Sequence, residues 1–272
     1  MESIGNDFVL VTQNDLGSQL DSAVLERLAI QACTRRWGVG SDGLLVVDRA
    51  PGGVTMRMFN PDGTEDFCGN GLRCAARFAV DSGWVGTEFQ IEHLREMVPV
   101  KVSGDRIETI ISPASFDPLR VPLLHSVGEL FQSEIFLERI DKQLRISSLT
   151  TGSTHTVLFV DRLPSDEEIQ VVGPALEHHP FFPKRTSVIW AVIEGESLRI
   201  RIWERGAGET LGCGTGSSAA AAVFCRIRGR GGIVEVRNRG GTVIVEMESW
   251  DSPIRLSGSA HLVFQGVFDF LD

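Results

Sequence analysis

The sequence predicts a mixed α/β fold, richer in strand than in helix and built from two similar halves. Short runs enriched in β-branched residues recur along the chain and end in Gly, Asn, Asp or Pro, as strands do. Fewer segments have the apolar spacing or the alanine content of a helix. A Cys-Gly-x-Gly motif occurs once in each half, each time before an alanine-rich segment.

The expected strands are short and spread over both halves. They cover residues 8–12, 43–47, 54–60, 88–92, 98–102, 109–111, 156–159, 187–192, 198–203, 233–236, 242–246 and 261–267. Helices are expected at 22–35, with Asp21 as N-cap, at 72–81 and 217–226 after glycine-rich turns, and near 165–177. Residues 112–122 contain three prolines among small polar residues and form the linker candidate between the halves.

Length and composition exclude several classes of protein. A chain of 272 residues forms one large domain or two modest ones, and 42% hydrophobic with 23% charged residues is typical of globular proteins, not disordered or fibrous ones. The net charge of -10 argues against a nucleic acid or an anionic membrane as partner, because phosphate binding needs a basic surface. No apolar run reaches the ~20 residues of a membrane span, and the start MESIGNDF has no signal-peptide pattern, so we expect a cytoplasmic protein.

The five cysteines are expected to be free thiols, since disulfide-stapled scaffolds are shorter and denser in cysteine. Cys33, Cys74 and Cys225 lie in apolar helical contexts and are expected to serve packing. Cys68 and Cys74 have a spacing that zinc could use, but no matching pair occurs elsewhere, and we expect no metal.

The two Cys-Gly-x-Gly motifs belong to a longer duplication. Cys68 and Cys213 are 145 residues apart, and the same offset aligns Gly63 with Gly208, Gly69 with Gly214 and Gly71 with Gly216. A shorter similarity relates residues 5–8 to residues 152–155. A period this long indicates two homologous lobes and not a solenoid.

The motif also predicts chemistry. A cysteine at a helix N-terminus lies beside backbone N–H groups without intrahelical partners, and the helix dipole there lowers a thiol pKa and attracts a carboxylate. Two such thiols facing one another across a cleft suit removal of a proton from one face of a carbon and its return to the other face. This pattern predicts a racemase or epimerase without a cofactor, in which one cysteine is a thiolate and the other a thiol.

The residues around both cysteines resemble the active-site signatures of the diaminopimelate epimerase family. The similar segments are 59–78 and 203–222, and the resemblance extends through residues 5–8, 35–42, 182–183 and 258–264. Proline racemases are similar at the second cysteine only, because their first motif has His where this chain has Asn70.

The resemblance implies two pseudo-symmetric lobes, each a curved, mostly antiparallel sheet around a central helix. One lobe would contain residues 1–116 plus 263–272 with Cys68, and the other residues 117–262 with Cys213. It also implies a cofactor-independent isomerase of lysine biosynthesis that converts LL- to meso-diaminopimelate and forms a homodimer.

Carried over residue by residue, the resemblance makes Cys68 and Cys213 the acid/base pair, with support from His155 and Glu204. The residues expected to bind substrate are Asn6, Gly43, Asn60, Gly69, Asn70, Ser153, Ser187, Glu204, Arg205, Gly214 and Thr215. Arg205 suits a distal carboxylate.

Three positions depart from the family pattern. The family has Gln at Gly43 and Asn at Ser187, and it has Gly-Asn-Pro-His where this chain has Gly-Ser-Thr-His with Ser153. Loss of a buried donor changes recognition of a polar substrate strongly. The substrate alternatives are therefore diaminopimelate or another amino acid such as histidine. A non-epimerase isomerase or binding relative is the other class, and the retention of both cysteines counts against it.

Overall fold

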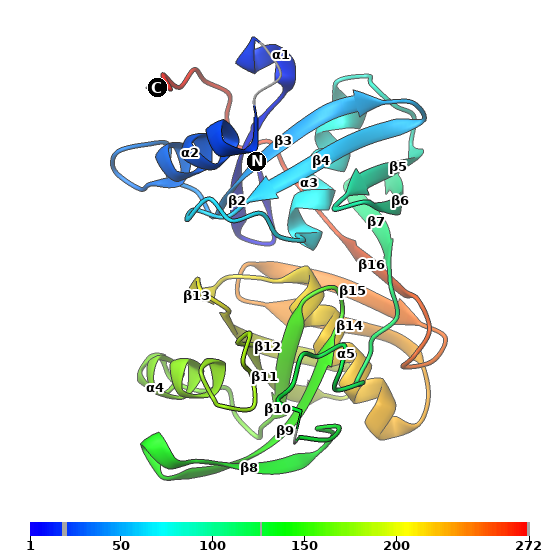
Figure 1. The fold of residues 1–272 in the computed structure, drawn as a ribbon. Helices are drawn as coiled ribbons and strands as arrows, with labels where there is room; N and C mark the ends of the chain where they lie inside the picture. Colours follow the sequence, from blue (N-terminus) through cyan, green and yellow to red (C-terminus); the bar gives the residue numbers. More distant parts are fainter. Residues whose placement is uncertain (18–20, 126, 271–272) are drawn as a thin grey trace. The chain divides into compact units, whose positions relative to one another are not determined.

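The computed structural model describes residues 1–17, 21–125 and 127–270, which form two compact units (Figure 1). Unit 1 contains residues 1–110 and 257–272, and unit 2 contains residues 111–256. Within the residues that the structure describes, no helix is both long enough and apolar enough to cross a membrane.

The sheet of unit 1 is mixed, and its strands lie side by side in the order in which they occur in the sequence. The strands are β1 (Glu2–Ser3), β2 (Asn6–Val11), β3 (Gly43–Ala50), β4 (Gly53–Phe59), β5 (Glu88–His93), β6 (Glu96–Ser103) and β7 (Arg106–Ile111), and the helices are α1 (Gln13–Leu16), α2 (Ser22–Cys33) and α3 (Gly69–Asp81). The β2/β3 and β4/β5 pairs are parallel, and the other pairs are antiparallel.

Unit 2 repeats this plan with extra strands. Its elements are β8 (Ser133–Leu137), η1 (Glu138–Ile140), β9 (Lys142–Thr150), β10 (Thr154–Phe159), α4 (Asp166–Glu177), β11 (Ser187–Glu194), β12 (Ser197–Glu204), β13 (Gly208–Thr210), α5 (Gly214–Arg228), β14 (Gly232–Asn238), β15 (Gly241–Met247) and β16 (Ile254–Gly258). The strand order is β16-β15-β14-β12-β11-β10-β9-β8, with β13 beside β12. The β10/β11 and β12/β14 pairs are parallel.

The order β2-α2-β3-β4-α3-β5-β6 of unit 1 therefore recurs as β10-α4-β11-β12-α5-β14-β15 in unit 2, apart from the short helix α1 after β2 and the short strand β13 after β12. The strand directions agree pair by pair. Gly63 and Gly208, which the offset of 145 aligns, have nearly equal φ angles of 86° and 84°. The mixed α/β, mostly antiparallel fold with a duplicated core confirms the sequence prediction.

In unit 1 a helix covers each face of the sheet at β3. Alternate residues of β3 pack on opposite sides: Leu44 and Val46 join the cluster of α2, and Leu45 and Val47 join the cluster of α3. Because both faces of β3 are buried, its sequence reads as a continuous apolar run without polar alternation.

Unit 2 is arranged in the same way. Helix α4 packs on β11 through Ile169, Val172 and Leu176, beside Val188 and Trp190. Helix α5 is buried from Gly214 through Cys225 and contacts β9, β10, β11, β12, β14 and β15, so it is a central helix (Figure 1). Its alanines allow this close packing because a Cβ methyl needs little space.

The strand expected at residues 261–267 is wrong. His261 forms an isolated bridge with Glu2, and no strand is assigned to residues 262–267. Leu262, Val263 and Phe264 are 52%, 62% and 64% exposed, so their apolar pattern does not reflect a buried sheet face. The sequence prediction also missed the strands β1, β8, β9, β13 and β16 and the short helices α1 and η1.

Candidate active site

Cys68 is the N-cap residue of α3. Its backbone is extended (φ -137°, ψ 105°), and its Sγ accepts the backbone N–H of Gly71 at 3.3 Å. The sulfur thus occupies the place that a Ser or Asp oxygen takes in an ordinary N-cap, where the helix dipole favours negative charge. The thiol position predicted from the sequence is found here.

Cys213 has the same geometry on α5. Its φ and ψ angles are -138° and 121°, and its Sγ accepts the backbone N–H of Gly216 at 3.4 Å. Each unit therefore holds one cysteine sulfur at a helix N-terminus. The first turn of such a helix, formed here by Gly69 and Asn70 or by Gly214 and Thr215, points its backbone N–H groups along the positive end of the helix dipole and is suited to a carboxylate.

The third residue of each helix is a glycine at which a Cβ would be crowded. A Cβ on Gly71 would lie 2.9 Å from Leu45 Cδ2, and one on Gly216 would lie 2.6 Å from Ile202 Cδ1. Both would also stand 3.4 Å from the cysteine sulfur of their own motif. The second glycine of Cys-Gly-x-Gly thus keeps the space beside the thiol open.

A side chain from a later strand accepts the backbone N–H of each cysteine. In unit 1, Cys68 N–H donates to His93 Nε2 at 3.1 Å, and in unit 2, Cys213 N–H donates to Asn238 Oδ1 at 3.4 Å. His93 ends β5 and Asn238 ends β14, each 25 residues after its cysteine.

A chain of polar contacts leads from Cys213 to His155. The Thr215 hydroxyl lies 3.3 Å from Cys213 Sγ and 3.4 Å from His155 Nε2. His155 Nδ1 lies 2.8 Å from the Ser153 carbonyl oxygen, which can only accept, so Nδ1 carries the proton and Nε2 is the acceptor. Burial lowers the pKa of His155 to about 4, so the ring is neutral at pH 7.

Thr215 can therefore serve either state of the thiol. Its hydroxyl donates to Cys213 Sγ when the sulfur is a thiolate, and it donates to His155 when the S–H donates to the threonine oxygen. The structure brings together four predicted residues in this chain: Cys213, Thr215, His155 and Ser153, whose hydroxyl lies 3.4 Å from His155 Nε2.

In unit 1 the corresponding position is Asn70, and its side chain makes contacts within the unit. Its Nδ2 donates to Asn6 Oδ1 at 3.2 Å, and its Oδ1 accepts from Arg73. Asn6 in turn donates to Asp42 at 2.6 Å. The two predicted substrate residues Asn6 and Asn70 are thus neighbours, and the buried Arg73 guanidinium fixes the orientation of the Asn70 amide.

Gly43 and Ser187 occupy equivalent places. Gly43 opens β3 opposite Phe8, and Ser187 opens β11 opposite His155. A Cβ on Gly43 would lie 2.8 Å from Met58 Cε and 3.0 Å from the Phe59 carbonyl oxygen, so a side chain there requires Met58 to move.

Ser187 is buried, and its hydroxyl accepts the backbone N–H of Arg205 at 3.1 Å. Glu204 accepts the Thr210 hydroxyl at 2.6 Å. Three residues expected near substrate, Ser187, Glu204 and Arg205, therefore meet at the end of β12.

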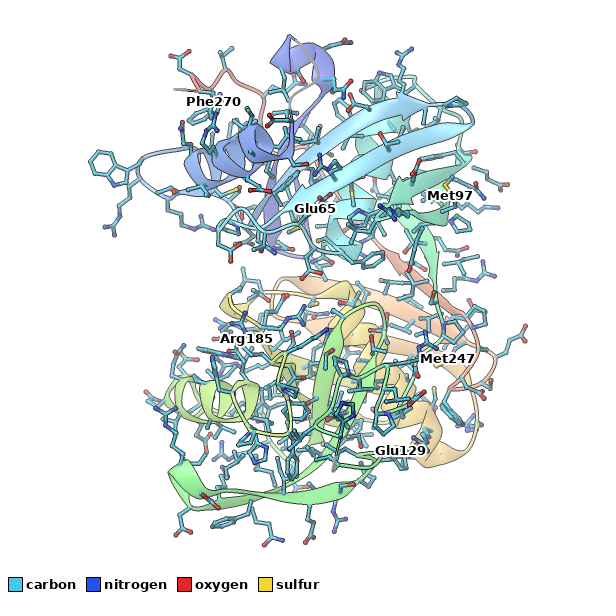
Figure 2. All side chains as sticks on the ribbon, viewed as in Figure 1. Glu65, Met97, Glu129, Arg185, Met247 and Phe270 are labelled. Atoms are coloured by element: carbon cyan, nitrogen blue, oxygen red, sulfur yellow. The ribbon has the colours of Figure 1, made fainter. Side chains whose placement is uncertain are left out.

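Glu177 anchors the turn after β12. This buried carboxylate accepts from Trp203 Nε1 at 2.7 Å and from Gly206 N–H at 2.9 Å. It also pairs at 3.2 Å with Arg185, which is labelled in Figure 2. It holds the Trp203 side chain before Glu204 and the Gly206 backbone after Arg205.

Asn60 lies in a turn after β4. Its Nδ2 donates to the Thr64 hydroxyl at 3.1 Å, and its backbone N–H donates to the Thr64 carbonyl at 2.8 Å. Of the predicted site residues in unit 1, the described contacts link Asn6 to Asn70, whereas those of Asn60 are local to its turn.

The other three cysteines are buried, and all five are free thiols. Burial raises the pKa of Cys33 and Cys225, and it raises the pKa of Cys74 to about 12. Thiols of this kind remain protonated and unreactive at neutral pH.

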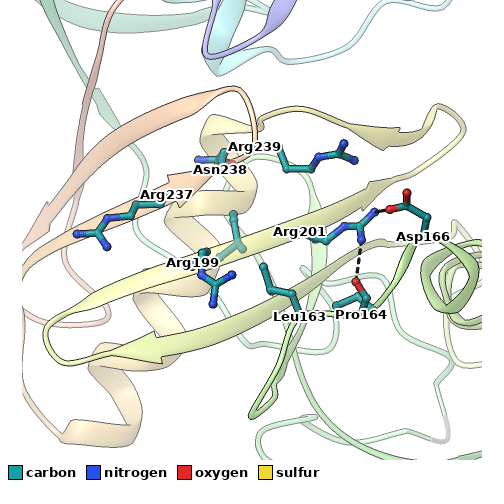
Figure 3. Close-up of a pocket in the computed structure, with 9 residues that line it drawn as sticks. Leu163, Pro164, Asp166, Arg199, Arg201, Arg237, Asn238 and Arg239 are labelled. Carbon is teal, nitrogen blue, oxygen red and sulfur yellow. Dashed lines mark hydrogen bonds and ion pairs between the residues drawn. The ribbon is translucent and has the colours of Figure 1, made fainter.

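A separate hollow of about 400 Å³ lies in unit 2 beside β12 and β14 (Figure 3). Four arginines line it, and each is already paired with a carboxylate, so it is not a strongly cationic anion site. The pairs are Arg199 with Glu194, Arg201 with Asp166 and Glu209, Arg237 with Glu194 and Glu235, and Arg239 with Glu209.

Sequence reasoning missed His93, Asn238, Glu177 and Arg73. The equal spacing of His93 and Asn238 from their cysteines could have found the first two. Glu177 gave a weaker signal, because a carboxylate at a helix C-terminus opposes the helix dipole and needs another reason to be there. Nothing local in the sequence indicates that Arg73 is buried.

Comparison with known proteins gives a consistent result over the whole chain. The profile of the family described as Diaminopimelate epimerase matches residues 1–114 and 147–263. The chain is 36% identical to the diaminopimelate epimerase of Desulfovibrio desulfuricans, covering 98% of this chain and 96% of the relative. It is also 36% identical to that of Moorella thermoacetica, covering 98% and 97%.

Solved structures share the fold at low identity. A hydroxyproline epimerase from Agrobacterium vitis superposes with a TM-score of 0.68 at 13% identity, covering 95% of this chain and 87% of that chain. A phenazine biosynthesis PhzF family protein from Enterococcus faecalis gives a TM-score of 0.63 at 16% identity, covering 98% and 94%. Together with the matched profile and the full-length relatives, these findings show that the chain belongs to the diaminopimelate epimerase family.

Proposed function

We propose that this protein is a cofactor-independent epimerase that converts LL-diaminopimelate to the meso isomer. The observation that carries the proposal is the pair of Cys68 and Cys213, each the N-cap of an equivalent helix, in a chain whose full-length relatives are diaminopimelate epimerases.

The proposed reaction is a transfer of two protons at one carbon. A thiolate takes the α-proton from one face, the electron pair of the C–H bond is delocalised into the adjacent carboxylate, and a thiol gives a proton to the other face. The proposal requires that Cys68 and Cys213 address opposite faces of this carbon. The thiolate and the thiol exchange roles after each turnover.

The N-terminal turns of α3 and α5 would stabilise the charge that develops on the carboxylate. Backbone N–H groups and the helix dipole are fixed before the reaction and need no reorganisation. At Cys213 the Thr215 hydroxyl accepts from the thiol or donates to the thiolate, and neutral His155 accepts the hydroxyl proton in the first case. We assign His155 and Glu204 to support, and Asn6, Asn60, Asn70 and Arg205 to binding of the substrate.

A second candidate is epimerisation of a different amino acid by the same chemistry. Gly43 is its specific support, because this position has no side chain and a Cβ there would lie 2.8 Å from Met58 Cε, and Ser187 uses its hydroxyl on the backbone of Arg205. The polar side chains available to bind the distal end of a substrate therefore differ from those of the family pattern.

Exchange of the α-proton in deuterium oxide, followed by NMR, tests both candidates. The panel contains the diaminopimelate isomers and single enantiomers of other amino acids, histidine and proline among them. Exchange and epimerisation of diaminopimelate support the proposal. If only another amino acid exchanges its α-proton, that amino acid is the substrate of the same two-base mechanism. If no amino acid in the panel exchanges its α-proton, the proposal that the protein is an epimerase is refuted.

We also propose a homodimer in the cytoplasm. Support for the assembly comes from the exposed apolar side chains of Leu262, Val263, Phe264 and Val267, which a second copy could cover. Sedimentation equilibrium tests the dimer, and cell fractionation tests the compartment.

A further inference from the structure

The backbone N–H of an N-cap residue lies outside the helical hydrogen-bond ladder. In a capping box the side chain of the third helical residue accepts it, but here that residue is Gly71 or Gly216, which has no side chain. Because neither glycine has a side chain to accept it, and a Cβ at either position would be crowded by Leu45 or Ile202, the acceptor comes from another element. His93 and Asn238 supply it in the two units.

His93 is itself held firmly in place. It is fully buried, its Nδ1 donates to the Met56 carbonyl oxygen at 3.0 Å, and its ring stacks on Phe67 at 5.0 Å between centroids. The Met56 carbonyl fixes the tautomer, because it leaves Nε2 as the acceptor for Cys68 N–H. The His93 ring therefore contacts both Phe67, the residue before Cys68, and the backbone N–H of Cys68.

Asn238 is held by a different set of contacts. Its Nδ2 donates to the Ser217 hydroxyl at 3.1 Å and to the Val236 carbonyl at 3.4 Å. Ser217 in turn donates to the carbonyl oxygen of Cys213 at 2.8 Å. Asn238 and Ser217 thus hold Cys213 through both polar groups of its peptide backbone.

We propose that His93 and Asn238 are equivalent positioning residues, which fix the sulfurs of Cys68 and Cys213 by accepting the backbone N–H of each cysteine. The inference rests on the proposed function, since it assigns a role to residues around the two proposed catalytic thiols.

His93 and Asn238 differ in how their acceptor atoms respond to pH. Asn238 accepts at any pH, whereas His93 accepts only while Nε2 is unprotonated. The titratable groups facing the ring are Glu65 and Asp66 in the turn before α3 and Cys68 at its N-cap, and the exposed Glu96 is its register partner on β6. Burial lowers the pKa of His93 in spite of both carboxylates, so the ring is neutral near pH 7 and loses its acceptor only in acid.

The test compares two substitutions at His93 with one at an exposed histidine. His93→Ala removes the acceptor, and His93→Asn installs the residue that unit 2 uses at the same place. His125→Asn is the matched control, because His125 is exposed. The readouts are kcat as a function of pH and the rate at which iodoacetamide alkylates each cysteine, resolved by peptide mass spectrometry.

We expect His93→Ala to lower kcat about 10- to 100-fold and to change the alkylation rate of Cys68 but not that of Cys213. His93→Asn should restore most of kcat and should move the acidic limb of the pH profile. Asn238→Ala should change the alkylation of Cys213 alone. The control should resemble the unchanged protein in every readout.

Wild-type kcat and Cys68 alkylation in a folded His93→Ala protein would overturn the proposal, as would an unchanged acidic limb in His93→Asn. If the unchanged protein epimerises no amino acid, the proposed function fails. The alkylation rates would still decide whether these two residues position the thiols.

Discussion

The carboxylate of Glu177 accepts the indole N–H of Trp203 at 2.7 Å, and its other oxygen accepts the backbone N–H of Gly206 at 2.9 Å. The last residue of α4 therefore fixes the turn that carries Glu204 and Arg205.

Glu177→Gln should destabilise this turn, because the carboxylate accepts from Trp203, Gly206 and Arg185, whereas an amide has one acceptor oxygen and no charge. We expect a loss of about 1–3 kcal/mol in the free energy of unfolding, from one buried donor left unpaired. If Arg205 binds substrate, KM should rise more than kcat falls. Urea unfolding and steady-state kinetics measure both effects. Glu167→Gln, at an exposed position of the same helix, is the control, and equal stability of the two variants would contradict the interpretation.

The free energy of unfolding should decrease in acid because of the protonation of His155. Its pKa of about 4 in the folded protein lies below the ordinary value of 6.5, so the unfolded chain binds the proton more tightly. The stabilisation is complete above pH 6.5 and is lost as the pH falls toward 4, by up to about 3 kcal/mol. Urea unfolding of the native protein and of His155→Gln at several pH values isolates this contribution. Equal pH slopes for the two proteins between pH 6.5 and 4 would be the contrary outcome.

Gly43 and Met58 should be energetically coupled. Gly43→Ala places a Cβ 2.8 Å from Met58 Cε, and we expect it to cost about 1–3 kcal/mol of stability through overpacking. Met58→Ala alone opens a cavity, but in the double variant the new methyl partly fills that space. A double-mutant cycle should therefore give a favourable coupling energy of about 1 kcal/mol or more. Strict additivity would show that Met58 moves aside freely.

Each of the two thiols proposed as acid/base groups should be indispensable. Cys68→Ala and Cys213→Ala remove one of the two acid/base groups, and we expect epimerisation to fall at least about 1,000-fold in each, within the range of a lost general acid or base. Circular dichroism checks the fold. Cys225→Ala is the control, since its sulfur is buried in α5 away from the N-cap, and it should keep kcat within about threefold. Substantial activity in either N-cap variant would refute the two-base scheme.

The thiol-bearing helices could be predicted from the sequence because their signal is local. A Cys-Gly-x-Gly segment and an alanine-rich run lie next to each other in the chain, and the duplication provides a second copy. The capping of α2 by Asp21 and of α4 near Ser165 is equally local.

The β8–β9 hairpin could not be predicted in this way. Strand β9 buries Ser147 and Ser148, whose hydroxyls contact Gln132 and Thr156. Serines without apolar alternation resemble a loop in a sequence, and only the tertiary contacts satisfy them. His93 was missed for a similar reason, because β5 brings it to Cys68 from 25 residues away.

Unit 1 is formed by two separate segments of the chain, and this affects the order in which the two units fold. Ser3 donates to the Ser259 carbonyl at 2.7 Å, and Glu2 forms a bridge with His261. During synthesis the ribosome completes unit 2 at residue 256 while these partners of the first strand are still missing. A nascent chain stalled at that point should protect unit 2 from protease but leave β1 open. Unit 1, whose larger segment is synthesised first, is therefore the unit whose fold is completed last.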